Sequence, residues 1–170
     1  MRLKLKTQLN TIACLLAVTV LGGLAPTAFA GNIHVLGDVT FTPDHDALTL
    51  TADGRLAGLG NGDVLITIIA KADPTTTCTS PGGNEAPGQN PAPITITGTE
   101  SIPASEVKNG SLDFSVTTDA PAQPANAKTA GCPNRRWTAI IEDLAFTSAI
   151  IKVEQDGKTK TFSFTFDPAL

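Results

Sequence analysis

Apolar and polar residues alternate along much of the chain after residue 30. No segment there repeats with the 3.6-residue period of an amphipathic helix. The alternation is clearest in Val39–Thr42, Leu48–Thr51 and Ile94–Thr97. A two-residue repeat places successive side chains on opposite faces of a strand. Each segment therefore predicts a strand with one buried face.

Turn-forming dipeptides separate these segments. Asp53-Gly54 predicts a tight turn into a short strand at Arg55–Ala57. Asn109-Gly110 predicts a turn before the strand Leu112–Val116. The residues of that strand expected to point inward are Leu112, Phe114 and Val116.

The last forty residues predict a meander of three strands. Two strands come first, one with Trp137, Ala139 and Ile141 on one face and one with Ala149, Ile151 and Val153 on one face. Asp156-Gly157 then predicts a two-residue hairpin loop. The returning strand is expected to turn Phe162, Phe164 and Phe166 inward, with Lys152, Lys158 and Lys160 outward as protection against edge-to-edge assembly.

The apolar run Val64–Ala70 predicts a central strand that is covered on both faces. Asp73–Pro93 and Asp119–Arg136 interrupt the alternation with many Pro, Gly, Asn and Thr residues, which predicts two long irregular segments. Seven to nine short strands separated by turns are typical of an antiparallel, immunoglobulin-like β-sandwich. A closed barrel is the alternative fold.

The first thirty residues are typical of a cleaved signal peptide. Three basic residues precede a mostly apolar stretch from Ile12 to Leu24, and Ala28-Phe29-Ala30 has the small-x-small pattern of a cleavage site. We therefore expect one exported domain at residues 31–170, secreted or periplasmic, with no transmembrane segment. Lipidation at Cys14 is a disfavoured alternative, because few apolar residues precede that cysteine.

Cys78 and Cys132 are the two cysteines after residue 30, and an even pair in an exported chain predicts a disulfide. The bond would close a loop of about 55 residues, worth roughly 4 kcal/mol by the chain-entropy model. It would also bring the two irregular segments together at one end or edge of the sandwich. We expect no metal site at the thiols, because no histidine lies near them in the sequence.

The charge balance argues against nucleic-acid partners. Three of the 12 basic residues lie in the first thirty positions and all 16 acidic residues follow, so residues 31–170 carry a net charge of −7. Nucleic acids and anionic membrane surfaces attract basic patches instead. The charge balance does not oppose self-assembly, which is kept as an alternative.

The two joined loops are the best candidate for a binding surface, because rigid scaffolds commonly carry function on loops. Their Asn and Gly residues also suit turn geometry alone, which is the competing interpretation. The polar residues predicted to contact a ligand are Asn84, Glu85, Gln89, Asn90, Asn134, Arg135 and Arg136.

Trp137 is expected to pack in the core near the disulfide, with stacking on a sugar ring as the alternative. Asp44-His45-Asp46 is the densest group of potential metal ligands, and we expect it to be a solvated turn that binds no metal. Catalysis lacks any local motif, so we expect neither an enzyme nor a cofactor. A carboxylate site near Asp44 or Glu142 is the enzymatic alternative.

Three segments resemble a group of small, exported, uncharacterised bacterial proteins. They are AGLGNGDV (Ala57–Val64), TCTSPGGNEAPGQNP (Thr77–Pro91) and GCPN (Gly131–Asn134) with Trp137. The resemblance spans roughly Arg55 to Val153 and implies a secreted or envelope location. It implies no catalytic residue and no ligand.

Together these features predict a non-catalytic binding module whose disulfide-tied polar loops contact a protein or a glycan. A structural subunit of a cell-envelope layer or appendage is the alternative. The open edges of a sandwich permit such assembly, and Gly31–Phe41 is a candidate detachable strand.

Overall fold

A computed structural model describes residues 31–170, and the predicted signal peptide at residues 1–30 lies outside the described residues. Nine strands and one short 3-10 helix form the described chain. The elements in chain order are β1 (His34–Val35), β2 (Thr40–Asp44), β3 (Thr49–Ala57), β4 (Val64–Thr79), β5 (Glu85–Pro87), β6 (Ile94–Ile102), η1 (Ala104–Glu106), β7 (Ser111–Thr117), β8 (Thr138–Gln155) and β9 (Lys158–Thr165).

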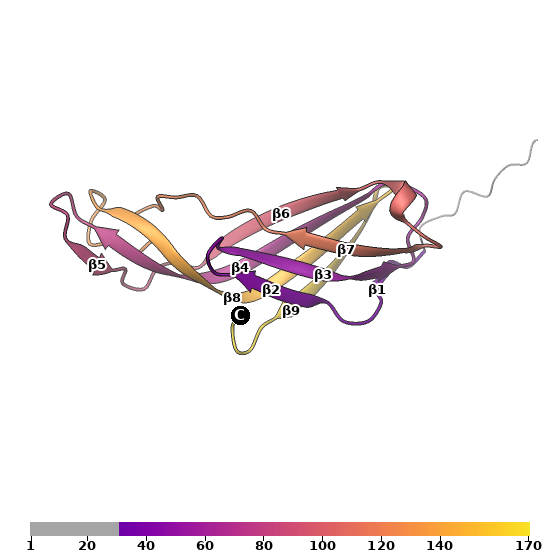
Figure 1. The fold of residues 1–170 in the computed structure, drawn as a ribbon, viewed down its shortest axis with the longest axis horizontal. Coiled ribbons are helices and arrows are strands. Elements are labelled where there is room, and N and C mark those ends of the chain that lie inside the picture. Colours follow the sequence, from indigo (N-terminus) through magenta and orange to yellow (C-terminus); the bar gives the residue numbers. More distant parts are fainter. Residues whose placement is uncertain (1–30) are drawn as a thin grey trace, which may run out of the picture.

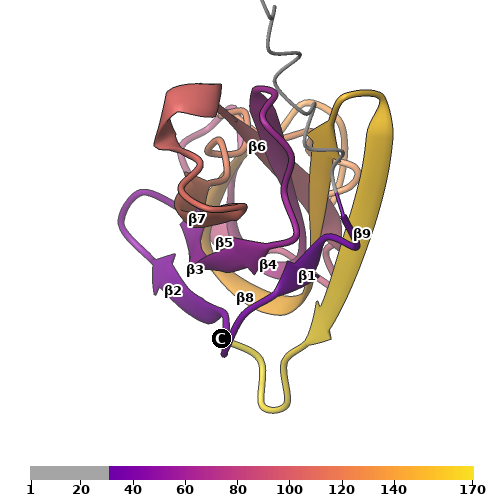
Figure 2. The same ribbon diagram turned by 90° about the vertical axis from the view of Figure 1, so that its right-hand side faces the viewer.

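The strands form two antiparallel sheets that pack face to face, which confirms the predicted β-sandwich and its seven to nine strands. In the first sheet, β1 and β2 pair with successive parts of one edge of β3, and β7 pairs with the other edge. In the second sheet, β4 lies between β8 and β6, β9 pairs with the far edge of β8, and β5 continues the β6 edge. The two layers are visible end-on in Figure 2.

The core lies between the sheets, because the inward positions of the alternating strands are almost all apolar. Its largest fully buried side chains come from β3, β4 and β8, and they include Leu50, Leu56, Ile66, Ile68, Phe146 and Ile151. The three predicted inward residues of β7 are also buried: Leu112, Phe114 and Val116.

Strand β4 differs from its prediction in two ways. It is central, but only one face is covered, because buried and more exposed residues alternate along it and Leu65 is 39% exposed. It also continues to Thr79, into the segment predicted to be irregular. The pairing with β8 shifts register on both sides of Pro74, between Lys71 and Ala72 and between Thr75 and Thr76. These irregularities accommodate a proline inside a central strand, where its missing N–H would break a regular ladder.

Strand β8 is a single 18-residue strand, whereas the sequence predicted two. Its buried positions change phase twice, from Ala139 and Ile141 to Leu144 and Phe146, and then to Ala149 and Ile151. The irregular pairing with β4 absorbs the difference, since Thr75 pairs with Asp143 and the next residue, Thr76, pairs with Ile141. Glu142 is the extra residue of this bulge. Thr147 is the extra residue of a second bulge, because Lys71 pairs with Ser148 and Ala72 pairs with Phe146. The two bulges together keep the apolar residues of β8 on the same side of the sheet.

The predicted turn at Asp53-Gly54 is also wrong. Both residues lie inside β3, where Asp53 pairs with Thr40 and Gly54 pairs with Phe114. The glycine serves packing, because a Cβ at position 54 would lie 3.0 Å from the Phe114 ring. A small residue at this position lets the aromatic ring lie against the backbone of β3.

The C-terminal hairpin is confirmed. Gln155 pairs with Lys158, and Asp156 and Gly157 form the two-residue loop with positive φ at both positions, as a type I′ turn requires. Asn109-Gly110 forms a turn before β7 as predicted, again with positive φ at both residues.

The aromatic residues of β9 face inward and are half-buried. Phe41 of β2 packs edge-to-face against Phe164 and Phe166, with ring centroids 4.9 and 5.0 Å apart, which joins the two sheets on this side. Lys158 and Lys160 are both exposed, but they lie on the strand face that carries Phe162 and Phe164, which is the interior side of the edge strand and not the predicted outer side. Lys152 lies on β8 and pairs with Glu154 at 2.9 Å.

Strands β4 and β8 run beyond the first sheet and carry one end of the molecule away from the sandwich (Figure 1). β5 and the loops on either side of it lie at this end, together with the segment that leads into β8. We call residues 74–92 and 120–139 the tip. The extension follows from the long alternating sequences of β4 and β8, which pair with each other as far as Thr79 and Thr138.

Candidate functional site

A disulfide between Cys78 and Cys132 joins the two halves of the tip, as predicted, with an S–S distance of 1.99 Å and Cα atoms 5.6 Å apart. Cys78 lies near the end of β4, and Cys132 lies in the segment that precedes β8. The bond thus brings together the two loop-rich segments at one end of the molecule.

Backbone hydrogen bonds reinforce the disulfide. The Gln89 amide donates to the Gly131 carbonyl oxygen at 2.9 Å, and the Ala92 amide donates to the Thr129 carbonyl oxygen at 2.8 Å. Strand β5 adds a third connection, because its three residues pair with Thr77–Thr79. The loops of the tip are therefore held by backbone geometry as well as by the covalent bond.

Thr76 and Gly88 form the tightest contact of the tip. The buried Thr76 hydroxyl donates to the Ala130 carbonyl oxygen at 2.8 Å, and the Gly88 amide donates to the Thr76 carbonyl oxygen at 2.9 Å. A Cβ at position 88 would lie 2.0 Å from the Thr76 Oγ1 atom and 2.2 Å from the Ala130 oxygen. Only glycine fits at position 88 in this arrangement.

The structure places every predicted ligand-binding residue on the exposed surface of the tip. These residues are Asn84, Glu85, Gln89 and Asn90 on the β5 side, and Asn134, Arg135 and Arg136 on the β8 side.

Part of this set also serves turn geometry. The backbone amide of Asn84 donates to Ser80 Oγ at 2.9 Å, and Asn90 adopts a positive φ of 47°. The Asn134 side chain accepts a hydrogen bond from the Arg136 amide at 2.9 Å. The side chains of Glu85 and Arg135 have no such local role in the described chain, which leaves them available to a ligand.

Arg135 lines a surface hollow of about 350 Å³ together with Asn126, Ala127 and Lys128. Neither Asn126 nor Lys128 was predicted from the sequence. Asn126 fixes the local turn, because its Oδ1 atom accepts hydrogen bonds from the amides of Lys128 (3.0 Å) and Thr129 (3.4 Å). An Asn followed by polar residues in a Pro-rich and Ala-rich segment was the available signal for this turn.

A second hollow of about 410 Å³ lies beside the first, and Asn126 lines both. It runs between the start of β6 and the segment 119–126. Thr95, Thr97 and Thr129 contribute hydroxyl groups to its walls, and Asp119 contributes a carboxylate. We call it the β6 groove.

The tip differs in charge from the rest of the domain. It contains three of the nine basic residues of residues 31–170, namely Lys128, Arg135 and Arg136, but only one of the 16 acidic residues, Glu85. The tip therefore carries a net charge of +2 on a remainder of −9. Within the described chain, no carboxylate lies within ion-pair distance of these three cations.

Trp137 is half-buried at the tip and does not belong to the main hydrophobic core, contrary to the expectation of a core residue. Its amide donates to the Asn134 carbonyl oxygen at 3.3 Å, which ties it to the turn that follows Cys132. The main hydrophobic core lies within the sandwich and does not extend to the disulfide, where the buried residues are small.

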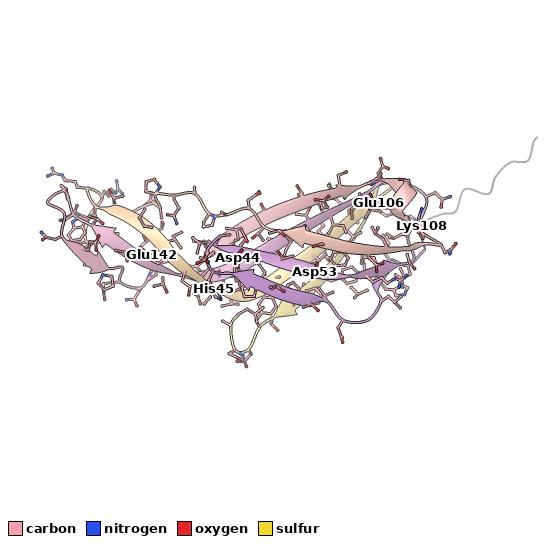
Figure 3. The ribbon with its side chains drawn as sticks, viewed as in Figure 1. Asp44, His45, Asp53, Glu106, Lys108 and Glu142 are labelled. Carbon is pink, nitrogen blue, oxygen red and sulfur yellow. A yellow bond between two sulfur atoms is a disulfide. The ribbon has the colours of Figure 1, made fainter. Side chains whose placement is uncertain are left out.

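Asp44, His45 and Asp46 form an exposed turn between β2 and β3, as predicted (Figure 3). Asp44 Oδ1 accepts hydrogen bonds from the amides of Asp46 and Ala47. His45 Nδ1 donates to Asp143 Oδ1 at 2.7 Å, and this hydrogen bond is the main cause that lowers the pKa of Asp143 from its ordinary value of 3.8. Within residues 31–170, no three potential metal-ligating side chains cluster together.

The glycine-rich residues 58–63 connect β3 to β4. Gln155, a residue that sequence reasoning missed, holds this connection against β8. Its side chain accepts from the Gly60 amide and donates to the Gly62 carbonyl oxygen, both at 2.7 Å. A glutamine that is only 2% exposed needs both partners.

No helix within the described residues has the length and hydropathy to cross a membrane. No protein-family model matches the chain, and no curated protein matches it. The resemblance to a group of exported bacterial proteins stays a prediction.

Proposed function

We propose that this protein is an exported, non-catalytic binding module that presents its tip to a protein or a glycan. The observation that carries the proposal is the projection of a cross-tied, polar tip beyond the sandwich (Figure 1). Extending two strands away from the core orders many residues at an entropic cost and buries few large side chains in return. Such an extension is expected where the exposed surface that it carries has a use.

Export rests on the signal-peptide pattern of residues 1–30 and on the disulfide, since structural disulfides are typical of proteins outside the cytosol. The tip itself has the features of a recognition surface. It is tied internally, so little conformational entropy would be lost on binding, and its exposed side chains offer both hydrogen-bonding and charged groups.

Edge-to-edge assembly into an envelope layer is the alternative function. Strand β9 is an edge strand, but Lys160 points toward the interior side of that edge. An inward-facing charge on an edge strand opposes pairing with another sheet, because the pairing would bury it. We therefore favour the binding function.

A binding assay on protein and glycan arrays tests the proposal. The labelled wild-type protein is compared with a tip variant, N84A/Q89A/R135Q/R136Q, and with a control variant, E106Q/K108Q. Glu106 and Lys108 lie at the opposite end of the molecule (Figure 3), so the control alters charged surface residues away from the tip. We expect the tip variant to lose the wild-type binding pattern and the control to keep it. Equal patterns for all three proteins, or no wild-type binding, would contradict the proposal.

A further inference from the structure

The hollow beside Arg135 presents hydrogen-bond donors without an opposing acid. Its lining residues are Lys128, Arg135, Asn126 and Ala127, of which the first two carry cations and the third carries an amide donor. The Oδ1 atom of Asn126 is occupied by the turn, while its Nδ2 group has no partner in the described chain. Two cations and an amide donor around one small space form a set suited to an oxyanion.

The hollow is held in place by the bonds of the tip. The Cys132 amide donates to the Ala127 carbonyl oxygen at 2.8 Å, and the disulfide anchors Cys132 to β4. The Ala130 amide donates to the Asn126 carbonyl oxygen at 2.9 Å, which closes the turn that carries Lys128. Lys128 and Arg135 therefore project from two segments whose backbones are fixed to each other, which reduces the cost of forming the site on binding.

The electrostatic setting favours an anion at this end of the molecule. The tip is positive although residues 31–170 are strongly acidic overall, and its single carboxylate, Glu85, does not line the hollow. Asp119 lines the neighbouring β6 groove and not the hollow. A negatively charged ligand group is thus attracted to the hollow and repelled by most of the remaining surface.

The neighbouring β6 groove indicates what else the ligand contains. Thr95, Thr97 and Asn126 line it with polar side chains, and Ile94 and Ile141 line it with apolar ones. The Thr129 hydroxyl already donates to the Asn126 carbonyl oxygen at 3.1 Å, so it offers a ligand only an acceptor. Such a mixture suits the hydroxyl-rich, partly apolar rings of a sugar chain. Both spaces fall in the volume range of ligand sites, which begins at about 300 Å³. Because β6 is an edge strand, an extended acidic peptide is the competing occupant, and the peptide probe below tests it.

We propose that the hollow binds the carboxylate or sulfate group of an acidic glycan, and that adjoining sugar units lie in the β6 groove. The proposal rests on the proposed function, because it names the ligand class of the tip. Lys128 and Arg135 pair with the oxyanion, and Asn126 donates from Nδ2.

Isothermal titration of the full, disulfide-bonded protein tests the proposal. The probes are an oligogalacturonate for the carboxylate, a sulfated oligosaccharide of equal length for the sulfate, a neutral maltooligosaccharide and a polyglutamate peptide. We expect at least one acidic glycan to bind, and the neutral glycan and the peptide to bind much more weakly. K128Q and R135Q should each lower the affinity about three- to tenfold, and added salt should weaken binding.

Three further variants locate the site. R136Q removes the same charge from the tip outside the lining of the hollow, so it should cause a smaller loss than R135Q. K71Q removes a charge from an exposed position on β4 outside the tip and should leave binding unchanged. T95V should weaken binding of the oligogalacturonate but not of galacturonate, its monosaccharide unit, which is added as a further probe, because Thr95 lines only the groove.

The outcomes separate this inference from the proposed function. Equal losses for K128Q, R135Q and R136Q would overturn the hollow as the site, and peptide binding in place of glycan binding would overturn the ligand class. If no acidic glycan binds while the array signal still depends on the tip, the inference is wrong and the binding function stands. If the array signal is also independent of the tip, both are wrong.

Discussion

Removing the disulfide should destabilise the whole domain without unfolding it. Cys78 and Cys132 are 54 residues apart, and closing a loop of that length lowers the entropy of the unfolded chain by an amount worth about 4 kcal/mol at 25 °C. A domain of about 140 residues has a total stability of roughly 7–20 kcal/mol. The reduced protein is therefore expected to stay folded with a substantially lower unfolding free energy.

Guanidinium unfolding of the oxidised and reduced protein measures this difference. With a denaturant slope of about 4 kcal/mol per molar, the loss corresponds to a midpoint shift of about 1 M. Trp137, the single tryptophan, reports on the tip by fluorescence, while far-ultraviolet circular dichroism reports on the strands of both sheets. C78A/C132A provides a second route to the unlinked state that needs no reductant.

The two probes also distinguish local from global loss. If reduction loosens the tip first, the fluorescence transition of Trp137 precedes the circular dichroism transition, as expected for residues outside the main core. If the domain stays cooperative, both transitions shift together. Unchanged midpoints by both probes would refute the loop-entropy reasoning and the role of the bond in holding the tip.

Three other substitutions test separate parts of the structure by chemical denaturation. G88A should cost about 3 kcal/mol, because a methyl group displaces the Thr76 contact, whereas G83A should cost only about 1 kcal/mol for backbone strain, since no atom lies within 4 Å of its added Cβ. Q155A should cost about 2–3 kcal/mol by leaving two backbone groups of the β3–β4 connection without partners. D143N should cost about 0.5 kcal/mol at neutral pH, because the pair with His45 is half-exposed. The pKa of Asp143 is lowered in the folded state, so its stabilisation is present above the unfolded pKa and is lost as pH falls through the folded pKa. The difference between wild type and D143N should therefore disappear in acid. Equal costs for G88A and G83A, a neutral Q155A, or a D143N effect that grows in acid would each contradict the corresponding argument.

The sequence predicted what depends on local pattern. The two-residue alternation located most strands, and Asp156-Gly157 located the final hairpin because both residues tolerate positive φ. The same local rules failed where contacts with residues distant in the sequence determine the local structure. Asp53-Gly54 resembles a turn, but the strand continues through both residues. The Phe114 ring occupies the space that a side chain at position 54 would fill, so a glycine is needed there for packing.

The length of β4 and β8 was missed for a related reason. A bulge and a turn both interrupt the alternation, and the sequence around Glu142 gives no sign of which one occurs. The outcome depends on the pairing of β4 with β8, in which Pro74 also lies beside a shift of register. Pairing between distant segments is outside the reach of a local pattern.

The candidate site was only partly predictable. The cysteine pair identified the two segments that meet, and Arg135 was named among the binding residues. Lys128 and Asn126 were missed, because their position beside Arg135 depends on the turn at Asn126 and on the bond from the Cys132 amide to the Ala127 oxygen.

The composition of the tip explains why it needs a covalent bond. Its buried residues are small, including Cys78, Ala127, Ala130 and Ala139, and a buried methylene contributes only about 0.8 kcal/mol. Ordering a residue costs about 1–2 kcal/mol of backbone entropy, so apolar burial alone cannot fix a tip of about 40 residues. The disulfide, the paired strands and the Thr76 contact supply the remaining order without large side chains. Because stability there depends little on side-chain size, the exposed positions of the tip are free to carry charges and amides chosen for a ligand.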